Sequence, residues 1–157
     1  MNTSSVARRS NWVVRKWPRA QRAMARLHAR AYQRSGGRIG GHWFDGAPVL
    51  VLLTVGRRSG KLRRTPVLYL RDGDALVVLA ANAGSDRTPA WWRNLEAAGG
   101  GEVIVGGDRH AVRPRELTGA ERDRLWRAFV DMYPQAEYYA RFTDRHLPLV
   151  TLEPATR

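Results

Sequence analysis

Residues 48–80 read PVLVLLTVGRRSGKLRRTPVLYLRDGDALVVLA, and this stretch decides the fold class. It holds three short runs rich in Val and Leu, which predict strands over residues 48–55, 65–70 and 75–80. The last two runs are separated by RDGD at residues 71–74, and an Asp-Gly pair between strands is typical of a tight hairpin. The stretch therefore predicts consecutive antiparallel strands, with a longer basic loop between the first two.

The flanking segments add helices and three more strands. Residues 18–34 have helical spacing, Pro18 suits a first turn, and the glycine-rich residues 36–41 end the helix. The remaining predicted elements are a short helix over 89–97, a hairpin of 103–105 with 110–115, a helix from a capping box at 118–121 to about 133, a short helix over 134–142 and a strand over 149–153. Six strands with short helices between them indicate an α+β protein built on a small antiparallel barrel, not alternating βαβ units.

Length and composition exclude several classes of protein. The 157 residues fit one domain, and 43% hydrophobic with 26% charged residues is ordinary globular usage. The longest apolar run, residues 47–53, is too short to span a bilayer, and no signal peptide opens the chain. The absence of cysteine excludes disulfides, a thiol nucleophile and Cys-based metal sites. A cytoplasmic location is expected.

The charge is large and unevenly distributed. Lys and Arg total 27 against 14 acidic residues, a net charge of +13, and residues 1–41 hold ten basic residues and no acidic one. The chain is therefore divided into a basic arm and amphipathic helix, residues 1–35, and a barrel domain, residues 36–157. The arm predicts an anionic partner, lipid headgroups or nucleic acid, with a merely solvated arm as the alternative.

The predicted N-terminal helix has two neighbouring stripes. One is basic and consists of Arg19, Arg22, Arg26, Arg30 and Arg34, and the other is apolar and consists of Ala20, Met24, Leu27 and Ala31, with Trp12 and Trp17 upstream. The pattern favours packing of the apolar stripe on the protein's own domain. The alternative is a helix that lies on the inner face of an anionic membrane.

The loop at residues 56–64, GRRSGKLRR, is the strongest candidate for a binding site. Five of its nine residues are cationic, two glycines let backbone amides approach a ligand, and Ser59 adds a hydroxyl. This combination suits a phosphate or several carboxylates. The loop lacks the Gly-Lys-Ser/Thr order of a Walker loop, and the alternative is a basic hairpin loop that contacts only water.

Short motifs follow one another along residues 32–154. They are Gly37-Arg38-Ile39-Gly40, Gly56-Arg57-Arg58-Ser59-Gly60 with Arg63 and Thr65-Pro66, Asn82-Ala83-Gly84, Pro89-Ala90-Trp91-Trp92-Arg93-Asn94-Leu95, Met132-Tyr133-Pro134, Thr143-Asp144-Arg145 and Leu152-Glu153-Pro154. In order and spacing they resemble the deazaflavin (coenzyme F-420)-dependent nitroreductase family. The resemblance implies a split β-barrel of the FMN-binding type, often a homodimer, with coenzyme F-420 as cofactor and FMN as a weaker ligand.

The resemblance also implies roles for individual residues. The coenzyme's phosphate and polyglutamate tail would contact Arg57, Arg58, Ser59 and Arg63, with Lys61 and Arg64 ranked lower. The deazaflavin ring would lie along Thr65, Pro66, Val67 and Leu68, beside Ala80, Ala81 and Asn82, and the pocket would be closed by Ala90, Trp91 and Asn94. Adjacent helical residues point about 100° apart, so Trp91 is assigned to the pocket and Trp92 to packing.

Tyrosines near the C-terminus would line the substrate side. Tyr133 and Tyr139 match the family's positions, while Ala136 stands where an aromatic residue is expected and should widen the pocket. A surface aromatic cluster that includes Tyr138 is the alternative. The implied reaction is hydride transfer from reduced F-420 to a nitroaromatic or a quinone, with the proton from Tyr139 or water.

Other kinds of chemistry find little support in the sequence. His28, His42, His110 and His146 lack the short spacing of metal ligands, and no serine lies in an esterase elbow. One rival reading is an F-420- or flavin-binding carrier without efficient turnover. A second, a nucleic-acid-binding domain, is disfavoured because the basic residues are not interleaved with stacking aromatics and no helix-turn-helix is evident.

Overall fold

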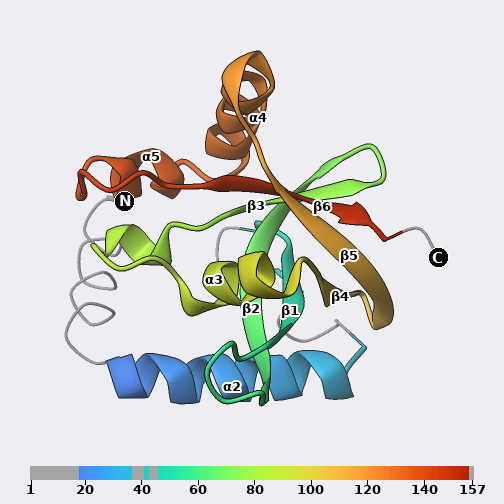
Figure 1. Ribbon diagram of the computed structural model, residues 1–157. Helices are drawn as coiled ribbons and strands as arrows, with labels where there is room; N and C mark the ends of the chain where they lie inside the picture. Colours follow the sequence, from blue (N-terminus) through green and yellow to red (C-terminus); the bar gives the residue numbers. More distant parts are fainter. Residues whose placement is uncertain (1–17, 37–40, 43–45, 156–157) are drawn as a thin grey trace.

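A computed structural model describes residues 18–36, 41–42 and 46–155, and six strands within them close into an antiparallel barrel (Figure 1). The order around the barrel is β1-β2-β3-β6-β5-β4, with β4 paired to β1. The strands are β1 (Val49–Val55), β2 (Leu62–Asp72), β3 (Ala75–Leu79), β4 (Gly101–Val105), β5 (Asp108–Glu116) and β6 (Leu149–Pro154). The helices are α2 (Pro18–Arg34), η1 (Asn82–Gly84), α3 (Ala90–Ala98), α4 (Gly119–Met132) and α5 (Gln135–Ala140). The predicted α+β barrel is confirmed.

The predicted strands are found, but β2 is longer than expected. It starts at Leu62 inside the basic stretch, because its first residues continue the ladder with β1 as far as the pair Val55–Leu62. The cations Arg63 and Arg64 therefore belong to a strand and not to a free loop. Hydrogen bonding across the hairpin outweighs the low strand preference of charged residues.

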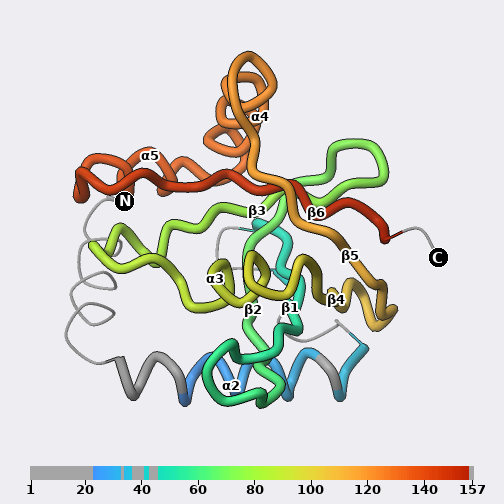
Figure 2. The backbone as a smooth tube through the Cα atoms, viewed as in Figure 1, coloured from blue at the N-terminus to red at the C-terminus, as the bar shows by residue number. Residues whose placement is uncertain are grey.

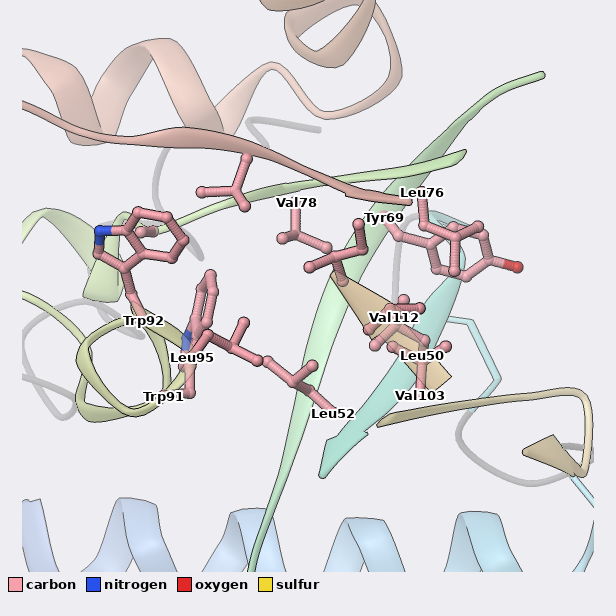
Figure 3. Packing of buried hydrophobic residues seen from close by; sticks show 13 residues of the cluster. Leu50, Leu52, Tyr69, Leu76, Val78, Trp91, Trp92, Leu95, Val103 and Val112 are labelled. Atoms are coloured by element: carbon pink, nitrogen blue, oxygen red, sulfur yellow. The ribbon is translucent and has the colours of Figure 1, made fainter. Parts of the chain in front are cut away.

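The barrel interior explains the apolar sequence of β1. Leu50 and Leu52 point into a core that also holds Trp91, Trp92 and Leu95 of α3 (Figure 3). Val51 and Leu53 of β1 face outward and are covered by α2 (Pro18–Arg34), so the strand is buried on both faces. A strand buried on both faces has a continuous run of apolar residues instead of alternation.

Helix α2 covers one outer face of the barrel, on the opposite side from α4 (Figure 1). Ala29 and Tyr32 of α2 are buried against Val51, Leu53 and Ile104. The prediction that the apolar stripe of this helix packs on the barrel is wrong, because Met24 is 72% exposed and Leu27 is 66% exposed. The helix packs through a small residue and a tyrosine whose hydroxyl accepts a hydrogen bond from the Gly106 amide at 2.7 Å.

Helix α4 begins where the sequence predicts but not by the predicted cap. The Thr118 side chain makes no capping hydrogen bond, and the carboxylate of Glu121 pairs with Arg115 at 2.9 Å. Glu121 therefore links the helix to β5 by pairing with Arg115 instead of taking part in the predicted capping box. Leu125 and Phe129 of α4 are buried on the outer face of the sheet, in a cluster with Val77 and Leu149.

Some sequence-based expectations fall outside the described residues: the part of the basic arm over residues 1–17, with Trp12 and Trp17, and the motif at residues 37–40. The division of the chain at residue 35 stays a prediction. No helix in the described part of the chain is both long enough and apolar enough to cross a membrane.

Candidate functional site

The basic loop between β1 and β2 is a compact turn. The Gly56 amide donates to the Lys61 carbonyl at 2.8 Å, and the Gly60 amide donates to the Gly56 carbonyl at 2.7 Å. Gly60 has φ +66°, a conformation that glycine adopts without steric cost. The Ser59 hydroxyl accepts hydrogen bonds from the Lys61 amide and from the Arg63 guanidinium, both at 3.3 Å. Ser59 therefore holds two of the loop's donors in one place.

Asn94 of α3 anchors this loop to the barrel. Its side chain is buried, and its Oδ1 accepts from the Arg57 amide at 3.2 Å and from Arg57 Nη1 at 3.3 Å. Its Nδ2 donates to Thr54 Oγ1 at 3.2 Å. The loop, α3 and the end of β1 are thereby joined in one hydrogen-bonded chain.

The loop carries charge that the described protein does not neutralise. Its five cationic side chains are exposed, and none of the ion pairs among the described residues involves them. Five like charges on one short hairpin repel one another unless an anion lies between them. The donor set, guanidinium groups with an ammonium and a hydroxyl, fits a phosphate or carboxylate ligand. The cationic side chains are Arg57, Arg58, Lys61, Arg63 and Arg64.

Strand β2 connects the loop with both apolar clusters. Successive residues of a strand point to opposite faces, so Val67 packs against the interior cluster and Leu68 against the outer one. The interior cluster includes Trp91, and the outer cluster includes Tyr133. Thr65, Pro66, Val67 and Leu68 are all only half-buried. These residues leave an accessible strip of strand between the cationic loop and the tyrosines.

The segment after β3 has an unusual backbone. Asn82 and Ala83 have φ values of +46° and +52°, and Gly84 follows at +74° (Figure 2 traces the chain here from β3 towards α3). Asparagine tolerates this region, but an alanine there costs about 1–2 kcal/mol. Ala80 and Ala81 are buried, and Asn82 Nδ2 donates to the Arg87 carbonyl at 2.9 Å. Such strain is found where the surrounding structure fixes a segment, often at functional sites.

Arg145 fixes this segment. Its guanidinium donates to the carbonyls of Ala81 at 2.9 Å, Ser85 at 3.2 Å and Ala80 at 3.3 Å, and also to that of His146 at 3.1 Å. Burial lowers the pKa of this guanidinium from its usual value, but arginine stays charged at any physiological pH. A charged donor is thus held against carbonyls on both sides of the strained turn.

The two tyrosines chosen from the sequence are in contact. The hydroxyl oxygens of Tyr133 and Tyr139 are 3.0 Å apart, and their ring centroids are 6.2 Å apart. Tyr133 is buried and Tyr139 half-buried. The backbone of Tyr139 lies against Gly84, where a Cβ atom would come within 3.0 Å of the Tyr139 carbonyl oxygen. The strained segment and the tyrosine pair are therefore packed directly on one another.

Two of the chosen residues, Ala136 and Trp91, are more enclosed than expected. Ala136 has no exposed surface and lies in the outer apolar cluster beside Tyr133, so no widened opening is visible at this position. Trp91 and Trp92 are both buried in the interior cluster, with ring centroids 6.4 Å apart and the rings edge to face (Figure 3). Helical geometry assigned Trp91 to the pocket and Trp92 to packing, but both side chains are buried.

The predicted residues form two groups joined by β2. One group contains the basic loop with Asn94, and the other contains residues 80–82 with the tyrosines. Ala90 is exposed at the start of α3. Sequence reasoning gave no role to Thr54, Gly84 or Arg145, although the Asn82-Ala83-Gly84 and Thr143-Asp144-Arg145 motifs include the last two. Among the described residues, no group of three or more histidine or acidic side chains is placed to hold a metal ion.

Comparisons with known proteins show what this chain is similar to. The model of the F420H(2)-dependent quinone reductase family matches residues 24–154. An F420H(2)-dependent quinone reductase of Mycobacterium tuberculosis is 36% identical over 135 residues, which cover 82% of this chain and 89% of that protein. The structure of the F420-H2 dependent reductase FDR-A is 30% identical with a TM-score of 0.62, covering 68% of this chain and 94% of that one. A chain solved as a domain-swapped dimer is 28% identical with a TM-score of 0.63, covering 87% and 97%.

Proposed function

Because the chain belongs to the F420H(2)-dependent quinone reductase family, we propose that it catalyses hydride transfer from reduced coenzyme F-420 to a quinone or nitroaromatic acceptor. The observation that carries the proposal is the placement of un-neutralised cations at one end of β2 and of a tyrosine hydroxyl pair in the outer apolar cluster against which Leu68 of the same strand packs. One end suits an anionic tail and the other suits an acceptor that gains negative charge. When bound, the coenzyme supplies the hydride, as cofactors generally supply the difficult chemistry.

The tail of the coenzyme would be held by Arg57, Arg58, Ser59 and Arg63. Ser59 accepts a hydrogen bond from Arg63, so the two side chains are held together before a ligand arrives. A preorganised donor set spends less of its binding energy on ordering side chains. Lys61 and Arg64 would add long-range attraction. This assignment is supported by the exposure of all five cations and by the exposed Ser59.

The ring would lie along the half-buried strip of β2. Thr65, Pro66, Val67 and Leu68 would contact one part of it, and Ala80, Ala81 and Asn82 another. Small side chains at Ala80 and Ala81 leave the backbone close to a ligand. Ala90, Trp91 and Asn94 at the start of α3 would close the site. Asn94 would act there mainly by fixing Arg57, since both polar atoms of its side chain have partners within the protein.

The acceptor would lie beside Tyr139, which is the more exposed member of the pair. Its hydroxyl would donate a hydrogen bond, or a proton, to the oxygen that gains charge, while Tyr133 orients it through the 3.0 Å contact. Hydroxyls and amides placed in advance stabilise such charge without reorganisation. Ala136 would border this region from the buried side.

Coenzyme preference tests the anion site. F-420 carries a phosphate and several carboxylates, whereas FMN carries one phosphate, so the protein should bind F-420 more tightly. Fluorescence titration of both ligands should give a preference that shrinks as salt rises, because exposed charges are screened over about 8–10 Å at ordinary ionic strength. Equal affinities at low salt would contradict the assignment of the loop to the polyglutamate tail.

We also infer that the protein forms a homodimer and that α2 lies on the cytoplasmic face of an anionic membrane. The domain-swapped dimer of the 28% identical chain supports the first inference. The second is supported by the exposed Met24 and Leu27, which lie next to the exposed cations Arg26 and Arg30. Apolar side chains among cations are the pattern of a helix on an anionic lipid surface.

A further inference from the structure

The Arg145 side chain contacts both sides of the strained turn at residues 82–84. Before the turn it donates to the carbonyls of Ala80 and Ala81, and after it to the carbonyl of Ser85. No ion pair among the described residues includes Arg145. Its hydrogen bonds to the described residues are thus directed to backbone, which is the arrangement expected when an arginine fixes the path of a chain.

A second link joins the same two segments. The Thr143 hydroxyl donates to the Asp86 carboxylate at 3.0 Å and accepts from the Arg145 amide at 3.1 Å. The loop that precedes β6 therefore holds the loop that precedes α3 at two places. Asn82 and Ala83, the two residues with positive φ values, lie between these two attachments.

The turn at residues 82–84 also determines where α5 lies. Gly84 has φ +74°, and its Cα faces the backbone of Tyr139 so closely that an added Cβ would lie 3.0 Å from the carbonyl oxygen and 3.3 Å from the Cα atom. Any shift of the turn therefore changes the space available to Tyr139. The hydroxyl of Tyr139 is in turn 3.0 Å from that of Tyr133.

We propose that Arg145 is a positioning residue that sets the place of Ala80–Asn82 and of Tyr139 together. The turn would lie on the ring side of the site and the tyrosine on the acceptor side, so one guanidinium fixes the distance between them. The planar fork of arginine has five N–H donors and can reach several carbonyls at once, whereas a lysine ammonium has three donors on a single atom. The role of Tyr139 in this statement rests on the proposed function, but the clamp on the turn does not.

Hydrogen exchange of the ligand-free protein tests the clamp. The amides of Gly84 and Ser85 donate to the carbonyls of Ala81 and Asn82, both at 3.0 Å, and are therefore protected in the intact turn. Arg145→Lys should speed their exchange by about ten- to a hundredfold, the loss expected for one or two charged hydrogen bonds. Strand amides of β1 and β3 should keep their rates. The control is Arg124→Lys on α4, where the arginine makes a bidentate pair with Asp72 of β2.

Unchanged exchange at Gly84 and Ser85, or an equal increase throughout the barrel, would overturn the clamp. Thr143→Val provides a milder variant, with a smaller increase at the same two amides. None of these measurements needs the coenzyme, so a failure of the proposed function would leave their result intact.

A double-mutant cycle tests the link to Tyr139. If Arg145 acts through Tyr139, then Arg145→Lys should lower turnover in the wild-type background but have little further effect in Tyr139→Phe, because residues that act as a unit are not additive. Turnover is measured at saturating reduced F-420 and quinone. Additive losses in the double variant would contradict positioning through Tyr139, and a merely structural role would give such additivity.

Discussion

Arg57 and Asn94 illustrate how one side chain can serve both structure and binding. The Asn94 amide accepts from the backbone and the guanidinium of Arg57, so one face of Arg57 is already occupied. The Arg57 side chain is nonetheless exposed, and a guanidinium has five donors. It can therefore bind an anion while Asn94 keeps its orientation.

We expect Arg57→Ala to weaken the binding of F-420 without affecting the chemical step. The loss of a charged hydrogen bond costs about 1.5–3 kcal/mol, which is about ten- to a hundredfold in the dissociation constant. Turnover at saturating coenzyme should change little, because the tail is remote from the reacting carbon. Fluorescence titration and steady-state rates separate the two, with Arg113→Ala on β5 as a matched exposed cation. Lost turnover with unchanged affinity would refute the anchoring role.

Tyr139→Phe should have the opposite effect. Removal of the hydroxyl should leave the affinity for F-420 nearly intact and lower turnover, because the group that orients or protonates the acceptor is gone. Tyr138→Phe is the control, since Tyr138 is the neighbouring residue of α5 and packs on Phe142 at 4.3 Å between ring centroids. If both variants behave like the wild type, Tyr139 has only a packing role.

At the level of residues, the sequence indicated candidate residues but not the contacts between them. The loop cations, Asn94 and the tyrosines were chosen from motifs, and the structure places Tyr133 against Tyr139 and Arg57 against Asn94. The role of Arg145 could not be predicted, because its partners are backbone carbonyls 60–65 residues away and carbonyls leave no signature in a sequence.

At the level of elements, α2 shows where pattern reasoning fails. Its bounds were predicted correctly, yet the face that packs holds Ala29 and Tyr32 and not Met24 and Leu27. A small alanine lets the helix approach the strands closely, and the Tyr32 hydroxyl reaches the β4–β5 turn at Gly106. Hydropathy ranks methionine and leucine above both residues, so the pattern indicated the wrong face.

Tyr32→Phe tests how α2 is attached, and its effect should depend on pH. The variant should lose about 0.5–1.5 kcal/mol of unfolding free energy at neutral pH, the value of one hydrogen bond. Burial raises the pKa of the Tyr32 hydroxyl above 10.0, so the folded protein keeps this proton where the unfolded chain has lost it. The wild type therefore loses stability as the pH rises from 10.0 through the raised pKa, whereas the variant lacks this loss.

Urea unfolding of both proteins between neutral pH and about pH 11 measures this difference. The difference in unfolding free energy between the wild type and Tyr32→Phe should be constant below pH 10.0 and should shrink above it. An advantage that stays constant across the whole range would mean that Tyr32 is not shielded from water, contrary to its 1% exposure.

At the level of the whole molecule, part of the barrel was predictable because three of its strand pairs, β1–β2, β2–β3 and β4–β5, join consecutive strands through short connections. The strands β1, β2 and β3 are consecutive neighbours, and residues 48–80 contain all three. The closure of the barrel could not be predicted in the same way. It depends on the long-range pairs β3–β6 and β1–β4, which join residues far apart in the chain.

The exposed face of α2 should determine membrane adsorption. Met24→Ser combined with Leu27→Ser should weaken binding to vesicles that contain anionic lipid, while the rate with a soluble nitroaromatic stays largely intact. Both residues are mostly exposed, so the fold should tolerate the change. Phe142→Ser, at an apolar residue that is 47% exposed beyond α5, is the control. If vesicle binding is the same in all three proteins, this face of α2 is merely solvated.

The reaction proposed for this barrel is the oxidation of reduced F-420 by a quinone. The most direct test is anaerobic mixing of the purified protein with reduced F-420 and a quinone, followed by the visible absorbance of the oxidised deazaflavin. The absorbance should appear far faster than without protein, its rate should saturate with both reactants, and Tyr139→Phe should slow it. Tight binding of F-420 with no acceleration over the reaction in buffer would refute the proposed reaction and would identify the protein as a carrier.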